Sequence, residues 1–165
     1  MYKYLLWFLK TGTIINLFFL WKTLNPPLIF SDQHLLIPAQ IVFFVSAYRC
    51  LFPVNYVNNV VLHNSIFSSI FITRLFATLA EVSYIYQFSY LIRKVNLNQI
   101  SFIDQLTWIM VIMVIISQCF VWGAILTQRQ KFYYYEEAGW GIIFIINTMT
   151  SAILYLTLEN IGSHE

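Results

Sequence analysis

The sequence predicts an all-α protein, a polytopic transmembrane helical bundle with about five spanning helices in a single domain. Of its 165 residues, 59% are hydrophobic and only 10% are charged, whereas soluble domains carry about 25% charged residues. The apolar residues fall into stretches of roughly 20, the length that crosses about 30 Å of hydrocarbon. Stretches such as IMVIMVIIS have no polar face, which fits a lipid surrounding rather than water.

The first span is expected at about residues 4–24. Pro26 and Pro27 follow its end, and proline cannot donate the backbone hydrogen bond that a continuing helix needs. Lys10 and Lys22 lie toward opposite ends of the span, where each can extend its ammonium group to the headgroups.

The second span is expected at about residues 35–52. Ser31 and Asp32 precede it and are both suitable N-cap residues. Pro38 falls near the expected first turn, where proline is tolerated, and Pro53 closes the helix.

Three further spans are expected at about residues 65–92, 106–126 and 140–158. The first of these is longer than the hydrocarbon layer is thick, so it should tilt or protrude. The segment TQRQKFYYYEEAG is expected to connect the last two spans, with its tyrosines at the membrane interface. No internal repeat and no heptad pattern is visible in the sequence.

Composition and motifs exclude several classes of function. Nine Lys and Arg against seven Asp and Glu give a formal net charge of +2 without a basic patch, so the expected partner is the lipid bilayer and not nucleic acid. Cys50 and Cys119 are isolated in apolar runs, and no metal site is expected. The absence of GxSxG, HExxH and P-loop motifs predicts no catalytic residues and disfavours an enzyme. No cofactor is expected.

The distribution of basic residues favours a cytoplasmic N-terminus by the positive-inside rule. In that orientation the cytoplasmic side would hold Lys3, Lys10, Arg49, Arg129 and Lys131, and the opposite side would hold Lys22, Arg93 and Lys94.

The candidate site begins with polar residues inside the expected span at 65–92. Arg74, Thr78 and Glu81 lie within about 60° of one another on one helix face. Because a charged side chain at mid-bilayer costs about 2.5–3.5 kcal/mol, this face should point into the bundle. The Cα atoms of Arg74 and Glu81 differ by roughly 10 Å in height, so a water, Thr78 or another helix is expected to complete their pairing.

Two polar residues in other spans fall at a similar depth. Gln118 is near the centre of the span at 106–126, and Asn147 is near the centre of the span at 140–158. We expect both to converge with Arg74 and Glu81 on one site, because transporters often bind solutes near the bilayer midplane. The alternative is that Gln118 and Asn147 hydrogen-bond between helices as structural contacts.

One local pattern resembles a known family. Arg74 followed by Leu75 and Phe76 in a long span, with Gln118 in QCFVWGAILT, resembles the arginine helix and last-helix glutamine of the proton-channel subunit a of rotary ATP synthases. The resemblance covers about 50 of the 165 residues. The sequence departs from that pattern because a further helix follows Gln118 and Thr78 stands in place of an asparagine. The resemblance implies proton movement only.

Three hypotheses for function follow. The leading one is a small membrane protein that translocates a proton, ion or small solute past Arg74 and Glu81, with Thr78, Gln118 and Asn147 lining the site. Its expected partners besides lipid are further copies of itself or other membrane subunits. The second is a non-catalytic subunit or assembly factor of a larger membrane complex. The third is a membrane-embedded enzyme acting on a lipid-like substrate.

Overall fold

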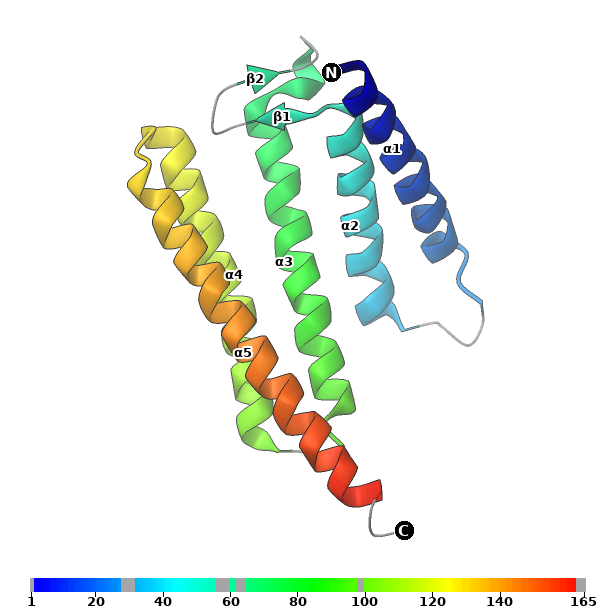
Figure 1. The fold of residues 1–165 in the computed structure, drawn as a ribbon, viewed down its shortest axis with the longest axis vertical. Coiled ribbons are helices and arrows are strands. Elements are labelled where there is room, and N and C mark those ends of the chain that lie inside the picture. Colours follow the sequence, from blue (N-terminus) through cyan, green and yellow to red (C-terminus); the bar gives the residue numbers. More distant parts are fainter. Residues whose placement is uncertain (1, 28–31, 56–59, 62–64, 98–99, 163–165) are drawn as a thin grey trace. The chain divides into compact units, whose positions relative to one another are not determined.

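The computed structural model describes residues 2–27, 32–55, 60–61, 65–97 and 100–162. Over these residues it is built almost entirely of helices (Figure 1), which confirms the predicted all-α fold class. The α-helices are α1 (Tyr2–Leu24), α2 (Gln33–Leu51), α3 (Ile70–Val95), α4 (Ser101–Thr127) and α5 (Lys131–Gly162). Between α2 and α3 lie the short paired strands β1 (Val54–Asn55) and β2 (Val60–Val61) and a 3-10 turn, η1 (Ile66–Ser68).

Four of the described helices, α1, α2, α4 and α5, are long and apolar enough to cross a membrane. The multi-pass membrane character is therefore supported for four of the five expected spans. The exception is α3, which has 26 residues but whose apolar sequence is interrupted by the polar residues Arg74, Glu81 and Gln87. A helix of this composition needs neighbouring helices or water to cover its polar positions if it lies in lipid.

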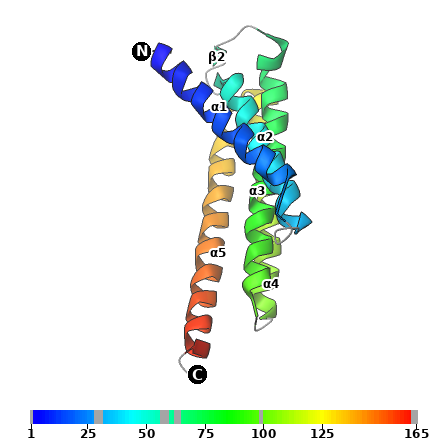
Figure 2. The same cartoon turned by 90° about the vertical axis from the view of Figure 1, so that its right-hand side faces the viewer.

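The chain divides into two compact units, residues 1–84 and 85–165. The boundary falls inside α3, so this helix gives its first 15 residues to one unit and its last 11 to the other. α3 is nevertheless one continuous helix (Figure 1), and Figure 2 shows its two ends from the side, partly behind α1 and α2. The single domain expected from the chain length stays a prediction.

In the first unit, α1 and α2 form an antiparallel hairpin (Figure 1). The rings of Phe19 and Phe43 are stacked with centroids 5.4 Å apart. One turn further along, the Gln40 side chain donates a hydrogen bond to the Thr23 carbonyl at 3.0 Å. The remaining surface of α1 is mostly apolar and exposed, as expected for a helix that faces lipid.

The start of α2 partly follows the prediction. Asp32 is its N-cap, and its carboxylate accepts a hydrogen bond from the His34 backbone N–H at 3.1 Å. Ser31, the other expected cap, lies outside the described residues. The expected place of Pro38 in the first turn is wrong, because α2 already begins at Gln33 and Pro38 is buried in the second turn.

An aromatic cluster connects α2 to the beginning of α3. The Tyr48 ring packs edge-on against the Phe76 ring, with centroids 4.8 Å apart. The Phe44 ring also packs against Phe76, with centroids 5.8 Å apart. The Tyr48 hydroxyl donates a hydrogen bond to the Phe67 carbonyl in η1. Because residues 66–68 form this turn, α3 begins at Ile70, five residues after the predicted start.

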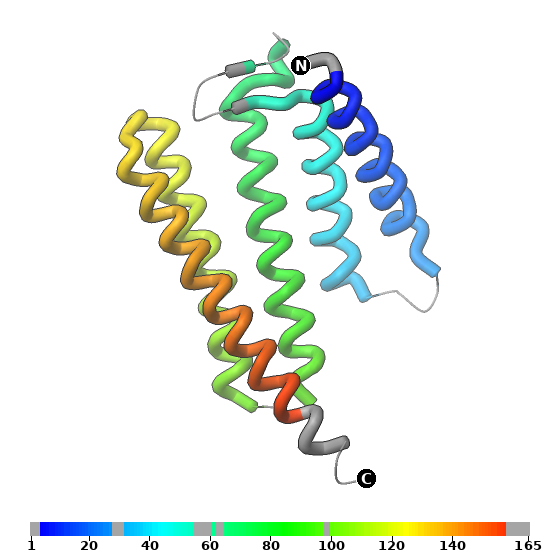
Figure 3. Tube along the Cα trace, in the orientation of Figure 1, coloured from blue at the N-terminus to red at the C-terminus, as the bar shows by residue number. Residues whose placement is uncertain are grey.

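In the second unit, α4 and α5 pack as an antiparallel hairpin, and the connection between them is tight (Figure 3). Gln128 ends α4 in the left-handed region with φ 54°. Seven of the nine buried positions of α4 alternate in spacing between four and three residues, so they form a heptad seam that was not predicted from the sequence. These positions are Ile103, Thr107, Met110, Val114, Ser117, Val121 and Ala124.

The predicted start of the last helix at residue 140 is wrong. α5 begins at Lys131, so most of the expected connector TQRQKFYYYEEAG is helical. Glu136 is buried. Gly139 faces α4 so closely that an added Cβ would overlap Ser117 Oγ. This close approach fits the preference for small residues where membrane helices meet.

Candidate functional site

The structure joins Arg74 and Glu81 directly. Arg74 Nη1 donates to Glu81 Oε1 and Nη2 donates to Oε2, each at 3.3 Å. The expectation that a water or another group must complete the pairing is therefore wrong. The guanidinium and the carboxylate face each other in the two-point arrangement that suits their shapes.

Helix geometry explains both the contact and its length. Side chains on a helix lean toward its N-terminus, which carries Glu81 back toward Arg74. Arg74 must bend the other way, and its long side chain can do so across nearly two turns. The 3.3 Å contacts are longer than the 2.7–2.9 Å usual for charged pairs, so the pair is formed at the limit of its reach.

The two members of the pair differ in exposure. The Arg74 side chain is 1% exposed and the Glu81 side chain is 22% exposed. Glu81 lies within about 3 Å of the midpoint of α3, whereas Arg74 lies about 13 Å from it, toward the helix start. Because the two charged groups are in contact, they lie at the same level of the helix, between these two Cα positions; there the guanidinium is enclosed and the carboxylate is partly open.

This arrangement limits the chemistry of the pair. Arginine does not lose its proton in proteins, so Glu81 is the member that can take up or release one. A proton on Glu81 would leave the Arg74 charge without its carboxylate, and an unpaired buried charge is costly.

The other predicted site residues lie in both units. Thr78 is half-buried one turn beyond Arg74 in the first unit. Gln118 is buried in α4, and Asn147 is half-buried in α5, both in the second unit. Their convergence with Arg74 and Glu81 stays a prediction.

Two polar atoms in the α4–α5 hairpin are enclosed without a hydrogen-bond partner among the described residues, namely Asn147 Oδ1 and Ser117 Oγ. Ser117 packs against Gly139, which gives it a role in close helix contact. A buried acceptor without a partner costs about 1–3 kcal/mol, so Asn147 is a position that water or a ligand donor would stabilise.

The sequence analysis missed a polar network that joins α3 to α4 within the second unit. Arg93 Nη1 donates to Ser89 Oγ at 2.5 Å and to Thr107 Oγ1 at 3.1 Å. Ser89 donates in turn to the Thr107 carbonyl at 2.9 Å, and the Arg93 guanidinium lies 4.4 Å from the centroid of the Trp108 ring. Arg93 was expected only as an interfacial cation, but it ties two helices together.

Asn96 completes the connection beyond α3. Its amide nitrogen donates to the Ile100 carbonyl at 3.1 Å and to Asp104 Oδ1 at 3.0 Å, and its amide oxygen accepts from the Ile100 N–H at 3.1 Å. These bonds link the end of α3 to the beginning of α4. A sequence signal was available, because Ser89, Arg93 and Asn96 recur at helical spacing on one face.

Within the part of the chain that the structure describes, no group of three His, Cys, Asp or Glu side chains could hold a metal ion. Comparison with known proteins gives no relative: no family model matches the chain, and neither a curated protein nor a solved structure matches it.

Proposed function

We propose that this multi-pass membrane protein translocates a proton, ion or small solute past Arg74 and Glu81. The observation that supports this is the unequal enclosure of the pair, with Arg74 sealed and Glu81 partly open at the middle of α3. Ionisable residues inside membrane helices are costly and are retained mainly where they serve transport or proton transfer.

In the proposed mechanism Glu81 is the group that exchanges a proton or cation, and Arg74 is its fixed counter-ion. While the contact is closed, the pair is neutral and the site carries little net charge. When it opens, Glu81 accepts the proton or cation, and the exposed guanidinium attracts an anion or water. The long 3.3 Å contacts support this step, because a pair at the limit of its reach opens at lower cost.

Flux measurements on reconstituted protein test the proposal. Proteoliposomes with a pH-sensitive dye inside would be given a pH gradient, and then separate gradients of small anions and cations. Wild type should conduct above protein-free vesicles, and Glu81→Gln should reduce that flux at least about tenfold. Glu137→Gln is the matched control, because Glu137 is an exposed carboxylate on α5. Equal flux through Glu81→Gln and wild type contradicts the proposed role of Glu81.

A second function is favoured by a different aspect of the same pair. Both terminal nitrogens of Arg74 bind Glu81 within α3 itself, so the pair also suits a structural role in a non-catalytic subunit of a larger membrane complex. This alternative predicts copurification with partner subunits in mild detergent and no flux from the isolated protein.

The enzyme hypothesis requires an opening toward lipid at the depth of Glu81. The apolar groove that the structure shows on α3 begins at Leu91, about 15 Å further along the helix. This groove is therefore not the opening that the enzyme hypothesis requires.

A further inference from the structure

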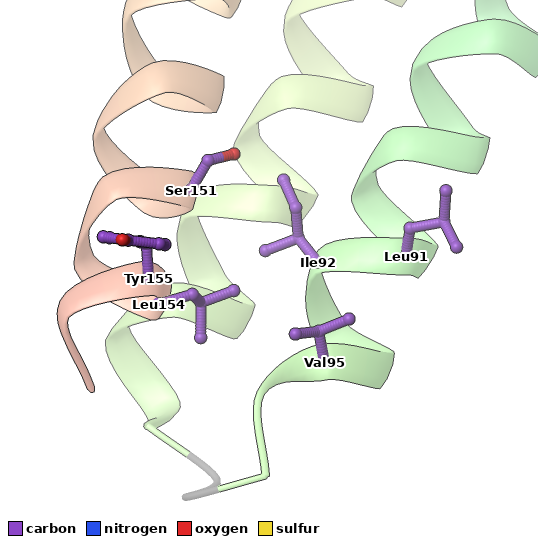
Figure 4. Close-up of a pocket in the computed structure, with 6 residues that line it drawn as sticks. All are labelled: Leu91, Ile92, Val95, Ser151, Leu154 and Tyr155. Carbon is purple, nitrogen blue, oxygen red and sulfur yellow. The ribbon is translucent and has the colours of Figure 1, made fainter. Parts of the chain in front are cut away.

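An open groove lies between the last turns of α3 and the C-terminal half of α5 in the second unit (Figure 4). Its volume is about 280 Å3. Its walls are almost wholly apolar, with hydroxyl groups contributed only by α5. The lining residues are Leu91, Ile92, Val95, Ser151, Leu154 and Tyr155.

The size and chemistry of the groove suit a slender apolar chain. Pockets for small molecules usually measure about 300–1,000 Å3, so this groove is at the small end of that range. Leu91, Val95 and Tyr155 are all exposed at its rim, so the groove opens to the medium around the helices. Around helices that cross a membrane, that medium consists of acyl chains.

The basic end of α3 beside the groove favours a lipid with an anionic headgroup. α3 ends with Arg93 and Lys94 in its last turn. Lys94 is exposed, lies about 60° around the helix from Leu91, and places Nζ 5.8 Å from the centroid of the Tyr90 ring. Cations together with Tyr and Trp are typical of the headgroup level, and basic groups between membrane helices bind anionic headgroups.

We propose that this groove binds one acyl chain of an anionic membrane phospholipid, with its phosphate beside Lys94. Leu91, Ile92, Val95 and Leu154 cover the chain. Ser151 offers a hydroxyl from the facing wall, and Tyr155 lies at the rim (Figure 4). Arg93 supports the site indirectly, because its bonds to Ser89 and Thr107 fix the last turn of α3 against α4.

Native mass spectrometry of the purified full chain tests the lipid site. The protein would be titrated in detergent with phosphatidylglycerol or with phosphatidylcholine of the same chains, and retained lipid would be counted per protein. We expect one retained phosphatidylglycerol, with phosphatidylcholine bound several-fold more weakly. Lys94→Gln should weaken phosphatidylglycerol binding about fivefold, because one interfacial cation contributes roughly that factor. Lys22→Gln, an exposed lysine on α1, is the charge control.

A second pair of variants tests the groove itself. Ser151→Phe places a ring in the groove and should abolish the retained lipid, whereas Ala152→Phe places the same ring on the adjacent exposed position and should not. Equal retention of the two lipids, or the same result for both phenylalanine variants, overturns the proposal. The proposal is also overturned if wild type is a dimer and Ser151→Phe converts it to a monomer that retains the same amount of lipid. In that case a second copy of the chain, and not a lipid, would occupy the groove.

Discussion

The sharpest energetic prediction concerns the coupling between Arg74 and Glu81. Glu81→Gln removes the negative charge but keeps the shape of the side chain, which leaves a guanidinium that is only 1% exposed without its counter-charge. Breaking a buried ion pair in this way costs about 3–5 kcal/mol. We expect about 3 kcal/mol, the lower end, because the contacts are long and Glu81 is 22% exposed.

The reverse change should cost less. Arg74→Gln leaves a carboxylate that is already partly exposed, so we expect a loss of about 1–2 kcal/mol. The double variant leaves no unpaired charge and should be no less stable than Glu81→Gln alone, since uncharged replacements of a buried pair are often nearly neutral. The cycle should therefore show an interaction of at least about 1 kcal/mol.

Unfolding in mixed micelles by titration with sodium dodecyl sulfate, followed by circular dichroism, measures these free energies for the four proteins. Glu137→Gln serves as a control for removing an exposed carboxylate and should change stability by less than about 0.5 kcal/mol. If the two single effects add within about 0.5 kcal/mol in the double variant, Arg74 and Glu81 do not form the pair described above.

Three further predictions concern the second unit. Gly139→Ala should destabilise the hairpin by about 1–3 kcal/mol through overlap with Ser117, whereas Gly141→Ala, with open space at its Cβ, should not destabilise it. The same unfolding titration compares the two. Gln128→Gly should stabilise the protein by about 1 kcal/mol, because glycine adopts a positive φ freely; a loss of stability would contradict this. Asn96→Ala should cost about 2 kcal/mol, because the N–H and the carbonyl of Ile100 both lose their hydrogen bonds to the Asn96 side chain. Amide hydrogen exchange at Ile100 should become faster, and unchanged exchange would contradict the prediction.

The sequence predicted the helices well where composition alone decides. Long apolar runs between prolines located α1 and α2, and the cap at Asp32 followed from local hydrogen bonding. It failed at α5, where tyrosines and glutamates suggested a connector. The buried position of Glu136 shows that packing against another helix kept this polar stretch helical.

The heptad seam of α4 could not be seen in the sequence for a related reason. In a helix that is apolar on all sides, the positions that face a partner do not differ in hydrophobicity from those that face lipid. Only small or polar residues such as Thr107, Ser117 and Ala124 mark the seam. Spacing of small and polar residues is therefore the better signal in such helices.

For the candidate site, the sequence analysis placed Arg74 and Glu81 on one helix face but did not predict their direct bond. That prediction used only the separation of the Cα atoms along the helix and did not allow for the reach of the arginine side chain. It also missed the network around Arg93, since a cation at a helix end is adequately explained by the membrane interface. The convergence of Gln118 and Asn147 with the pair, and the cytoplasmic N-terminus, stay predictions.

Infrared difference spectroscopy on the reconstituted protein tests most directly whether Glu81 is a proton-accepting group. Acidification of wild type should produce a carbonyl band of a newly protonated carboxylic acid. That band should be absent from Glu81→Gln and retained in Glu137→Gln. Identical difference spectra for wild type and Glu81→Gln would show that Glu81 takes up no proton, and would contradict its proposed role in proton exchange.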